Sequence, residues 1–252
     1  MIDDLVAFGH DLLDETDAIA LGHFTTGVTA TAKPDRTLVT AADTEVEERI
    51  RARIADRWPG HGVMGEELGA DGADAETAWI VDPIDATHNF VRGIGVWATL
   101  LACRIGPDLA LGFASAPAMG ERWWAAASGG AWRRDARGER RIAVSKVASL
   151  AESQLLYGNP TALGGRVMSA ARHAWRSRGF GDFWGHMLVA SGSAEAMIED
   201  GVKPWDMAAP FVIVTAAGGR MTDLAGQPSW TDARILTSNG LIHDELLELL
   251  RG

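Results

Sequence analysis

The organisation of this chain follows from one segment, Trp79-Ile80-Val81-Asp82-Pro83-Ile84-Asp85-Ala86-Thr87-His88-Asn89-Phe90. The apolar run 79–81 is typical of a strand that is buried on both faces. Proline has no N–H to donate to a sheet and fixes its own φ, so we expect the strand to end at Pro83 and the chain to turn there. Asp82 and Asp85 would then lie together at the end of this strand.

The two aspartates favour a cation site made of oxygen ligands. The carbonyl of Ile84 lies between them in the sequence, and Thr87 adds a hydroxyl. Mg²⁺ prefers near-octahedral oxygen ligands at about 2.0–2.1 Å, which such a set can provide. The alternative is an Asp-Pro turn in which the aspartates only hydrogen-bond to the backbone. For this segment alone the turn is the commoner structure, and the rest of the chain favours the metal site.

Composition limits the classes of protein to consider. With 252 residues, the chain can form one large domain or two closely packed halves. Hydrophobic residues make up 47% and charged residues 23%, which is typical of a globular protein. The net charge of -11 argues against a nucleic-acid partner and agrees with a site that collects cations.

The sequence predicts a cytoplasmic protein with no membrane partner. The single cysteine, Cys103, lies in an apolar segment, which predicts a buried thiol and no internal disulfide, as in a reducing compartment. No apolar run approaches the ~20 residues that cross a bilayer. Asp3 and Asp4 stand where a secretion signal would be basic.

Residues 1–144 are predicted to form an α+β half that binds the metal. Apolar residues recur at helical spacing over 2–20 and every four residues from Val46 to Trp58, which indicates two helices. The polar segment 25–37 predicts a mobile loop that contains Lys33. A short strand at 63–64 leads into Gly65-Glu66-Glu67 and an acidic loop. Short apolar segments separated by turns then predict an antiparallel sheet, at 96–104, 109–115, 122–126 and 131–132.

Residues 145–252 are predicted to form an α/β half that completes the site. We interpret the charged segment 133–141 as a connector at the boundary between the two halves. Beyond it, predicted strands and helices alternate, which indicates an α/β layer. The predicted strands are 155–157, 195–199 and 235–237, and the predicted helices are 166–175, 183–191, 207–217 and 241–250.

Two further acids lie at predicted helix starts. Asp43 opens the second helix, and Asp206 follows Pro204 at the start of a later one. An acid at this position commonly caps its helix by accepting a backbone N–H, and that interpretation stays open for both residues. Glu66 and Glu67, taken alone, are equally typical of a solvated surface.

Three segments together resemble the inositol monophosphatase superfamily in their order and spacing. The resemblance extends over essentially the whole chain, including Leu38-Val39-Thr40 with Asp43, and the Gly218-Gly219 turn. It implies a layered α-β-α-β-α sandwich, a Mg²⁺-dependent phosphomonoesterase and a homodimer, for which the Trp-rich region Arg122–Trp132 is our candidate contact. The segments are Gly65-Glu66-Glu67, Asp82-Pro83-Ile84-Asp85-Ala86-Thr87 and Trp205-Asp206-Met207-Ala208-Ala209.

The resemblance also implies roles for particular residues. Glu66, Asp82 and the Ile84 carbonyl would hold a first Mg²⁺. Asp82, Asp85 and Asp206 would hold a second, and Glu66 would share a weaker third; Mn²⁺ is a possible substitute. Thr87 and Glu66 would orient the attacking water, with Asp43 in the outer shell. Lys33 would belong to a loop that covers the phosphate, so that the predicted substrate contacts are Lys33, Asp85, Ala86, Thr87, His88, Asp182, Glu199 and Asp206.

Two residues depart from the family pattern. The family usually has glycine at the position of Ala86, where alanine costs about 1–2 kcal/mol if φ is positive and almost nothing if the residue is helical. His88 stands where lysine or threonine is more common, and its ring could contact phosphate or fill the wall of the pocket. These departures are the support for an alternative, a phosphate-binding or regulatory module without turnover. Against it, every predicted metal ligand is present.

The substrate prediction depends on the second half of the chain. The segment 178–184, the positions near Glu199, and the segments 120–126 and 238–246 resemble the histidinol-phosphatase branch more than the inositol branch. In the superfamily, the positions of Asp182 and Glu199 border the end of the pocket away from the phosphate. Two carboxylates there suit an ammonium and a protonatable imidazole, because charge-assisted hydrogen bonds are strong. We therefore expect L-histidinol phosphate as substrate, with myo-inositol 1-phosphate as the alternative, and Asp182 as a simple helix cap stays open.

Overall fold

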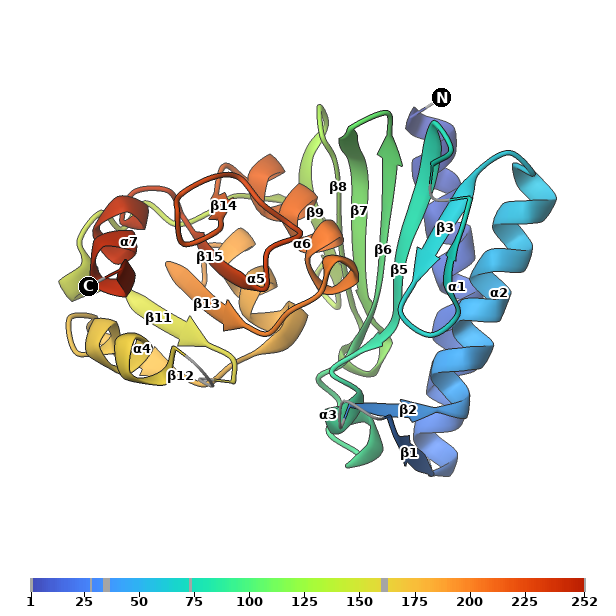
Figure 1. Cartoon of the computed structure of the whole chain (residues 1–252), viewed down its shortest axis with the longest axis horizontal. Helices are drawn as coiled ribbons and strands as arrows, with labels where there is room; N and C mark the ends of the chain where they lie inside the picture. The colour runs from blue at the N-terminus through green and yellow to red at the C-terminus, as the bar shows by residue number, and fades with distance from the viewer. Residues whose placement is uncertain (1, 28, 34–36, 73, 160–162, 252) are drawn as a thin grey trace.

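The computed structural model describes residues 2–27, 29–33, 37–72, 74–159 and 163–251. Its elements form five layers, helix, sheet, helix, sheet and helix, from one side of the molecule to the other (Figure 1). A hydrophobic core fills each space between neighbouring layers. The layered sandwich predicted from the sequence is confirmed.

The first layer is a pair of helices on the outer face of the larger sheet, α1 (Ile2–Thr26) and α2 (Ala41–Arg57). Their apolar stripes pack on that sheet, as the helical spacing predicted; Val46, Ile50 and Ile54 of α2 are buried. Between the two helices, β1 (Ala30–Ala32) pairs with β2 (Leu38–Thr40). The predicted loop 25–37 is thus partly a helix end and partly a hairpin, while positions 28 and 34–36 lie outside the described residues.

The second layer is an eight-stranded sheet in the order β10-β9-β8-β7-β6-β5-β3-β4. Every neighbouring pair is antiparallel except β3 and β5, which confirms the predicted antiparallel run after Phe90. The strands are β3 (Gly62–Gly65), β4 (Gly69–Asp71), β5 (Thr77–Asp85), β6 (Ala98–Ile105), β7 (Asp108–Ala116), β8 (Glu121–Ala126), β9 (Gly130–Asp135) and β10 (Gly138–Ile142).

Two expectations about this sheet were wrong. Segment 133–141 is not a connector, because β9 and β10 form a hairpin there whose arginines pair with acids, such as Arg140 with Asp135. Pro83 does not end its strand: β5 continues to Asp85. The pairing with β6 shifts register between Asp82 and Asp85, so the sheet does not need an N–H from Pro83 at this irregularity.

The remaining layers belong to the second half of the chain. A five-stranded mixed sheet has the order β12-β11-β13-β15-β14. Helices α5 (Asp182–Ala190) and α6 (Pro204–Ala216) lie between the two sheets, and α4 (Gly164–Ala171) and α7 (His243–Arg251) cover the far face (Figure 1). The strands are β11 (Gln154–Tyr157), β12 (Arg176–Arg178), β13 (Ala196–Asp200), β14 (Arg220–Thr222) and β15 (Arg234–Ser238).

Close packing between the layers places the start of α6 above the end of β5. Helix α6 crosses the sheet at Gly112 of β7, where a Cβ would lie only 2.7 Å from the carbonyl oxygen of Ala209. Trp123 and Trp124 of the adjacent strand are 1% and 6% exposed and pack in the cores on opposite faces of the sheet. These two side chains therefore stabilise the subunit itself and offer no surface to a second subunit. No described helix is long and apolar enough to cross a membrane.

Candidate active site

The end of β5 and the short helix α3 (Thr87–Val91) form the floor of the site. Asp82 is 2% exposed and accepts the N–H of Ile84 at 3.0 Å. The Thr87 hydroxyl donates to the carbonyl oxygen of Ile84 at 2.9 Å. Ala86 turns the chain from strand to helix in the left-handed conformation, with φ 66° and ψ 44°. Ala86 therefore has the positive φ at which alanine, in place of the family's usual glycine, costs about 1–2 kcal/mol.

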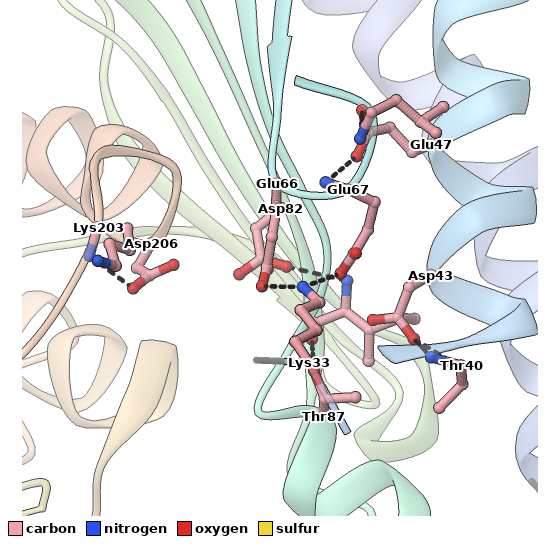
Figure 2. Close-up of polar contacts among 12 residues, drawn as sticks. Lys33, Thr40, Asp43, Glu47, Glu66, Glu67, Asp82, Thr87, Lys203 and Asp206 are labelled. Atoms are coloured by element: carbon pink, nitrogen blue, oxygen red, sulfur yellow. Dashed lines mark hydrogen bonds and ion pairs between the residues drawn. The ribbon is translucent and has the colours of Figure 1, made fainter. Parts of the chain in front are cut away.

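Glu66, Asp82 and Asp206 converge from three different elements (Figure 2). One carboxylate oxygen from each lies within 4.8 Å of the other two. Glu66 follows β3, Asp82 lies in β5, and Asp206 is in the first turn of α6, where it accepts the N–H of Lys203 at 2.8 Å. An all-oxygen set at this spacing fits a hard cation such as Mg²⁺.

The electrostatics of the cluster agree with a cation site. Burial, followed by repulsion from neighbouring carboxylates, raises the pKa of Asp82 and that of Asp85 well above the usual range. Burial also raises the pKa of Asp206 to about 7, with Glu66 and Asp182 adding repulsion. A divalent cation among these groups would relieve both the repulsion and the cost of burying the charges.

Lys33 lies against the acids of the Gly65-Glu66-Glu67 turn. Its ammonium donates to Glu66 Oε1 at 2.9 Å and to Glu67 Oε1 at 2.6 Å (Figure 2). Partial burial alone would lower the pKa of Lys33, but the hydrogen bonds to Glu67 and Glu66 outweigh it and the pKa rises. The structure thus brings this loop residue to the rim of the acidic cluster.

Asp43 is fully buried beside the cluster. Its Oδ2 accepts the N–H of Thr40 at 2.8 Å and the Thr40 hydroxyl at 2.5 Å, as the third residue of α2 in a capping box. Burial raises the pKa of Asp43 to about 6. Its Oδ1 is buried without a hydrogen-bond partner among the described residues. Asp43 therefore caps its helix with one oxygen and holds the other toward the interior.

The second half of the chain reaches the site through the start of α5. The N–H of Phe183 donates to Asp85 Oδ2 at 2.8 Å, and the N–H of Asp182 donates to Glu199 Oε1 at 3.2 Å. Asp182 has a φ of 57° and follows Gly181, the cap residue, at which no side chain makes a capping bond. Asp182 is thus the first residue of α5, and Gly181 occupies the cap position. The Asp182 side chain is exposed.

Asp182 and Glu199 form a second acidic pair beside Asp85. Desolvation by the surrounding protein raises the pKa of Asp182, although the residue is exposed, and nearby His88 lowers it. Burial, with repulsion from Asp182, raises the pKa of Glu199 to about 8. A Cβ at Gly158 would overlap the Glu199 carboxylate, so glycine at that position leaves room for the carboxylate where it lies. His88 itself is exposed and is not packed into a wall.

One residue of the site was missed by sequence reasoning. Glu47 of α2 is 0% exposed and its carboxylate holds the turn that carries Glu66 (Figure 2). The available signal was an acid within the apolar stripe of the helix, one turn after Asp43 and beside Val46. Acids are expected on the exposed face of α2, but an acid within its buried stripe calls for a specific partner.

A sequence profile of the inositol monophosphatase family matches residues 3–252. The chain belongs to this family. The resemblance to this family seen in the sequence is confirmed, and so is the prediction of a metal-dependent phosphomonoesterase. A histidinol-phosphatase of Streptomyces coelicolor is 40% identical over 99% of this chain and 97% of its own length. A histidinol-phosphatase of Mycobacterium tuberculosis is 41% identical over 86% of each chain.

Solved structures of the family share the fold. The IMPase of Thermotoga maritima superposes with a TM-score of 0.90 at 29% identity, over 98% of this chain and 97% of its own. An inositol monophosphatase from Anabaena superposes with a TM-score of 0.86 at 26% identity, over 99% and 96%. The five-layer arrangement is therefore that of the family.

Proposed function

We propose that this protein is a Mg²⁺-dependent histidinol-phosphatase, which hydrolyses L-histidinol phosphate to L-histidinol and phosphate. The observation that carries the proposal is the pair of carboxylates formed by exposed Asp182 and buried Glu199, which adjacent backbone N–H groups join to the acidic cluster. The similarity to histidinol-phosphatases over nearly the whole chain supports it. The two acids would lie at the non-phosphate end of the substrate, where they would favour a positively charged group.

The metal site of the proposal contains two or three ions. Glu66, Asp82 and the Ile84 carbonyl would hold one Mg²⁺. Asp82, Asp85 and Asp206 would hold another, and Glu66 would share a weaker third; Mn²⁺ would substitute. Bound Mg²⁺ supplies Lewis-acid polarisation and stabilises the charge that develops in phosphoryl transfer. Oxygen ligands without a thiolate or a histidine pair disfavour Zn²⁺.

The residues around this cluster position the reacting groups. The Thr87 hydroxyl donates a hydrogen bond to the Ile84 carbonyl, so its lone pairs are left to accept a hydrogen bond from the attacking water. The Glu66 carboxylate accepts the other hydrogen bond from that water. Lys33, on the rim, has an ammonium close enough to the cluster to pair with a phosphate oxygen.

The non-phosphate end of the substrate meets the second acidic pair. Glu199 Oε2 is buried without a hydrogen-bond partner among the described residues. A substrate ammonium or imidazolium would provide that partner, and its charge would stabilise the ionised form of an acid whose pKa burial raises to about 8. A neutral polyol, as in myo-inositol 1-phosphate, offers hydroxyl donors but no charge. It would gain less from these carboxylates.

The proposal includes the setting in which the enzyme works. We propose that the enzyme is a cytoplasmic homodimer. It would act in histidine biosynthesis on a small phosphomonoester, without a nucleic-acid partner. The dimer rests on the family resemblance, with a contact surface that does not include the buried rings of Trp123 and Trp124.

Phosphate release from a panel of phosphomonoesters, with Mg²⁺ and with excess chelator, tests the proposal. The panel includes L-histidinol phosphate, myo-inositol 1-phosphate and a generic aryl phosphate. We expect Mg²⁺-dependent release that is fastest with L-histidinol phosphate. Binding of phosphate esters without any release would instead support the inactive binding module, and full turnover in chelator would contradict the metal site.

A further inference from the structure

Glu47 is a fully buried acid one helical turn after Asp43, outside the predicted site. Its Oε2 accepts the N–H of Glu67 at 2.8 Å, and its Oε1 accepts the N–H of Leu68 at 3.2 Å. The carboxylate therefore binds two successive backbone groups of the turn that follows β3. In Figure 2 it points from α2 directly at the backbone of Glu67.

Arg51 fixes this carboxylate from the same helix. Its Nε donates to Glu47 Oε1 at 2.9 Å, and its Nη2 lies 2.7 Å from the same oxygen. The guanidinium also donates to the carbonyl oxygen of Gly69, at the other end of the turn. Because Arg and Glu stand four residues apart on one helix, a single ion pair holds both ends of the turn.

The turn in question carries Glu66 between two anchors. The N–H of Glu66 donates to the carbonyl oxygen of Val81 in β5 at 3.2 Å, one residue before Asp82. The next two N–H groups are those bound by Glu47. The backbone of Glu66 is thus fixed to the strand on one side and to α2 on the other. Its side chain has little freedom in where it leaves the turn.

Glycine at position 65 shows how close this contact is. A Cβ there would overlap the Glu47 carboxylate, so the turn and the acid pack without space between them. Burying a charge in this way is costly unless it is paired and hydrogen-bonded, and Glu47 meets both conditions. A hydrophobic residue could fill the same volume, but it could not bind the two N–H groups.

We propose that Glu47 is a positioning residue for the metal ligand Glu66. With Arg51, it sets where the Glu66 carboxylate lies relative to Asp82 and Asp206, and so sets the affinity of the site for its divalent cation. The inference rests on the proposed metal site, but not on the identity of the substrate. Residues that orient metal ligands typically change metal affinity or activity by about 10–100-fold when they are substituted.

Mn²⁺ binding to the full chain, followed by the EPR signal of free Mn²⁺, tests this role directly. Glu47→Gln keeps the shape of the side chain but cannot accept from all three donors, and we expect Mn²⁺ affinity to fall about 10–100-fold. The matched control is Glu48→Gln, an exposed neighbour on the same helix that loses the same charge. It should bind Mn²⁺ as the unmodified protein does. At saturating Mg²⁺, kcat of Glu47→Gln should recover to within about threefold while half-saturation stays shifted.

The outcomes separate this inference from its foundation. Equal Mn²⁺ affinity in Glu47→Gln and Glu48→Gln, with a lower melting temperature in the former, would show that Glu47 serves stability alone. An unmodified protein that binds no Mn²⁺ would overturn the metal site and this inference together, whatever substrate is hydrolysed. If Glu47→Gln does not fold, Arg51→Lys decides: it keeps the ion pair but loses the fork to Gly69, so a folded Arg51→Lys must bind Mn²⁺ more weakly by about threefold or more.

Discussion

The backbone N–H of Phe183 donates to the Asp85 carboxylate over 2.8 Å, and this bond joins the two halves of the chain at the site. The preceding N–H, that of Asp182, binds Glu199 at 3.2 Å. Two successive N–H groups therefore hold a proposed metal ligand and a proposed substrate ligand. Asp182, which lies between the two contacts, adopts a left-handed conformation with φ 57°.

Asp182→Gly separates the backbone role of this residue from its carboxylate. Glycine adopts a positive φ without strain, so we expect the free energy of unfolding to stay level or rise by about 1 kcal/mol. We also expect kcat/KM for L-histidinol phosphate to fall about tenfold or more, because one charge-assisted contact is lost. Urea unfolding and steady-state kinetics measure the two effects. Asp182→Asn is the control: it should lose activity but show no increase in the free energy of unfolding. A destabilised Asp182→Gly would indicate a structural role for the carboxylate.

Ala86→Gly should stabilise the protein. Ala86 has φ 66° and ψ 44°, a conformation that costs alanine about 1–2 kcal/mol. Glycine removes this strain but loses more entropy on folding, so the expected net gain is about 1 kcal/mol. The control is Ala52→Gly on the exposed face of α2, which should lose about 1 kcal/mol. If both variants are destabilised equally in thermal unfolding, the strain at Ala86 is absent.

Glu199 should make the metal-free protein less stable as the pH rises. Its pKa is about 8 in the folded protein, above the usual carboxyl range near 4.5. The folded state therefore keeps a proton that the unfolded state has lost, and stability falls as the pH rises from about 4.5 to about 8. For Glu199 alone, the loss is on the order of 5 kcal/mol.

Glu199→Gln removes this titration. Between pH 5 and pH 8, the free energy of unfolding of the metal-free variant should fall less steeply than that of the unmodified protein. The exposed Glu48→Gln, which removes a charge from the surface, should leave the slope unchanged. Parallel slopes in urea unfolding of the unmodified protein and Glu199→Gln would contradict the raised pKa of Glu199.

Asp206→Asn should abolish stabilisation by Mg²⁺ without harming the metal-free fold. Repulsion from Glu66 and Asp182 disfavours the charge on Asp206, so the neutral amide relieves it. The asparagine oxygen can still accept the N–H of Lys203, which keeps the start of α6 intact. Melting temperatures with and without Mg²⁺ check this. A large loss of metal-free stability would mean that Asp206 serves mainly as a helix cap.

The sequence could predict the features that lie within short segments. Apolar spacing identified α2 and the strand that carries Asp82, and the three acidic segments identified the family. It could not predict that β5 passes through Pro83, because that depends on a register shift against β6, a partner that begins only at Ala98. Likewise, arginines in segment 133–141 suggested an exposed connector, whereas pairing with acids makes them compatible with a hairpin.

The site shows the same division between local and distant information. The proximity of Glu66, Asp82 and Asp206 was expected from the family pattern, and the structure brings the three together. The conformation of Ala86 stayed open because residue type alone does not fix φ. Glu47 was missed because its partners, Glu67 and Leu68, follow about twenty residues later, and only the folded chain brings them to its carboxylate.

The central claim concerns the substrate, and one comparison tests it most directly. The measurement is kcat/KM for L-histidinol phosphate and for myo-inositol 1-phosphate at the same Mg²⁺ concentration, in the unmodified protein and in Glu199→Gln. The account predicts a preference for L-histidinol phosphate. It also predicts that Glu199→Gln lowers kcat/KM for L-histidinol phosphate by about 10–100-fold and lowers that for the inositol phosphate less. The reason is that only L-histidinol phosphate carries a positive charge that can pair with this acid. A preference for myo-inositol 1-phosphate, or equal losses on the two substrates, would contradict it.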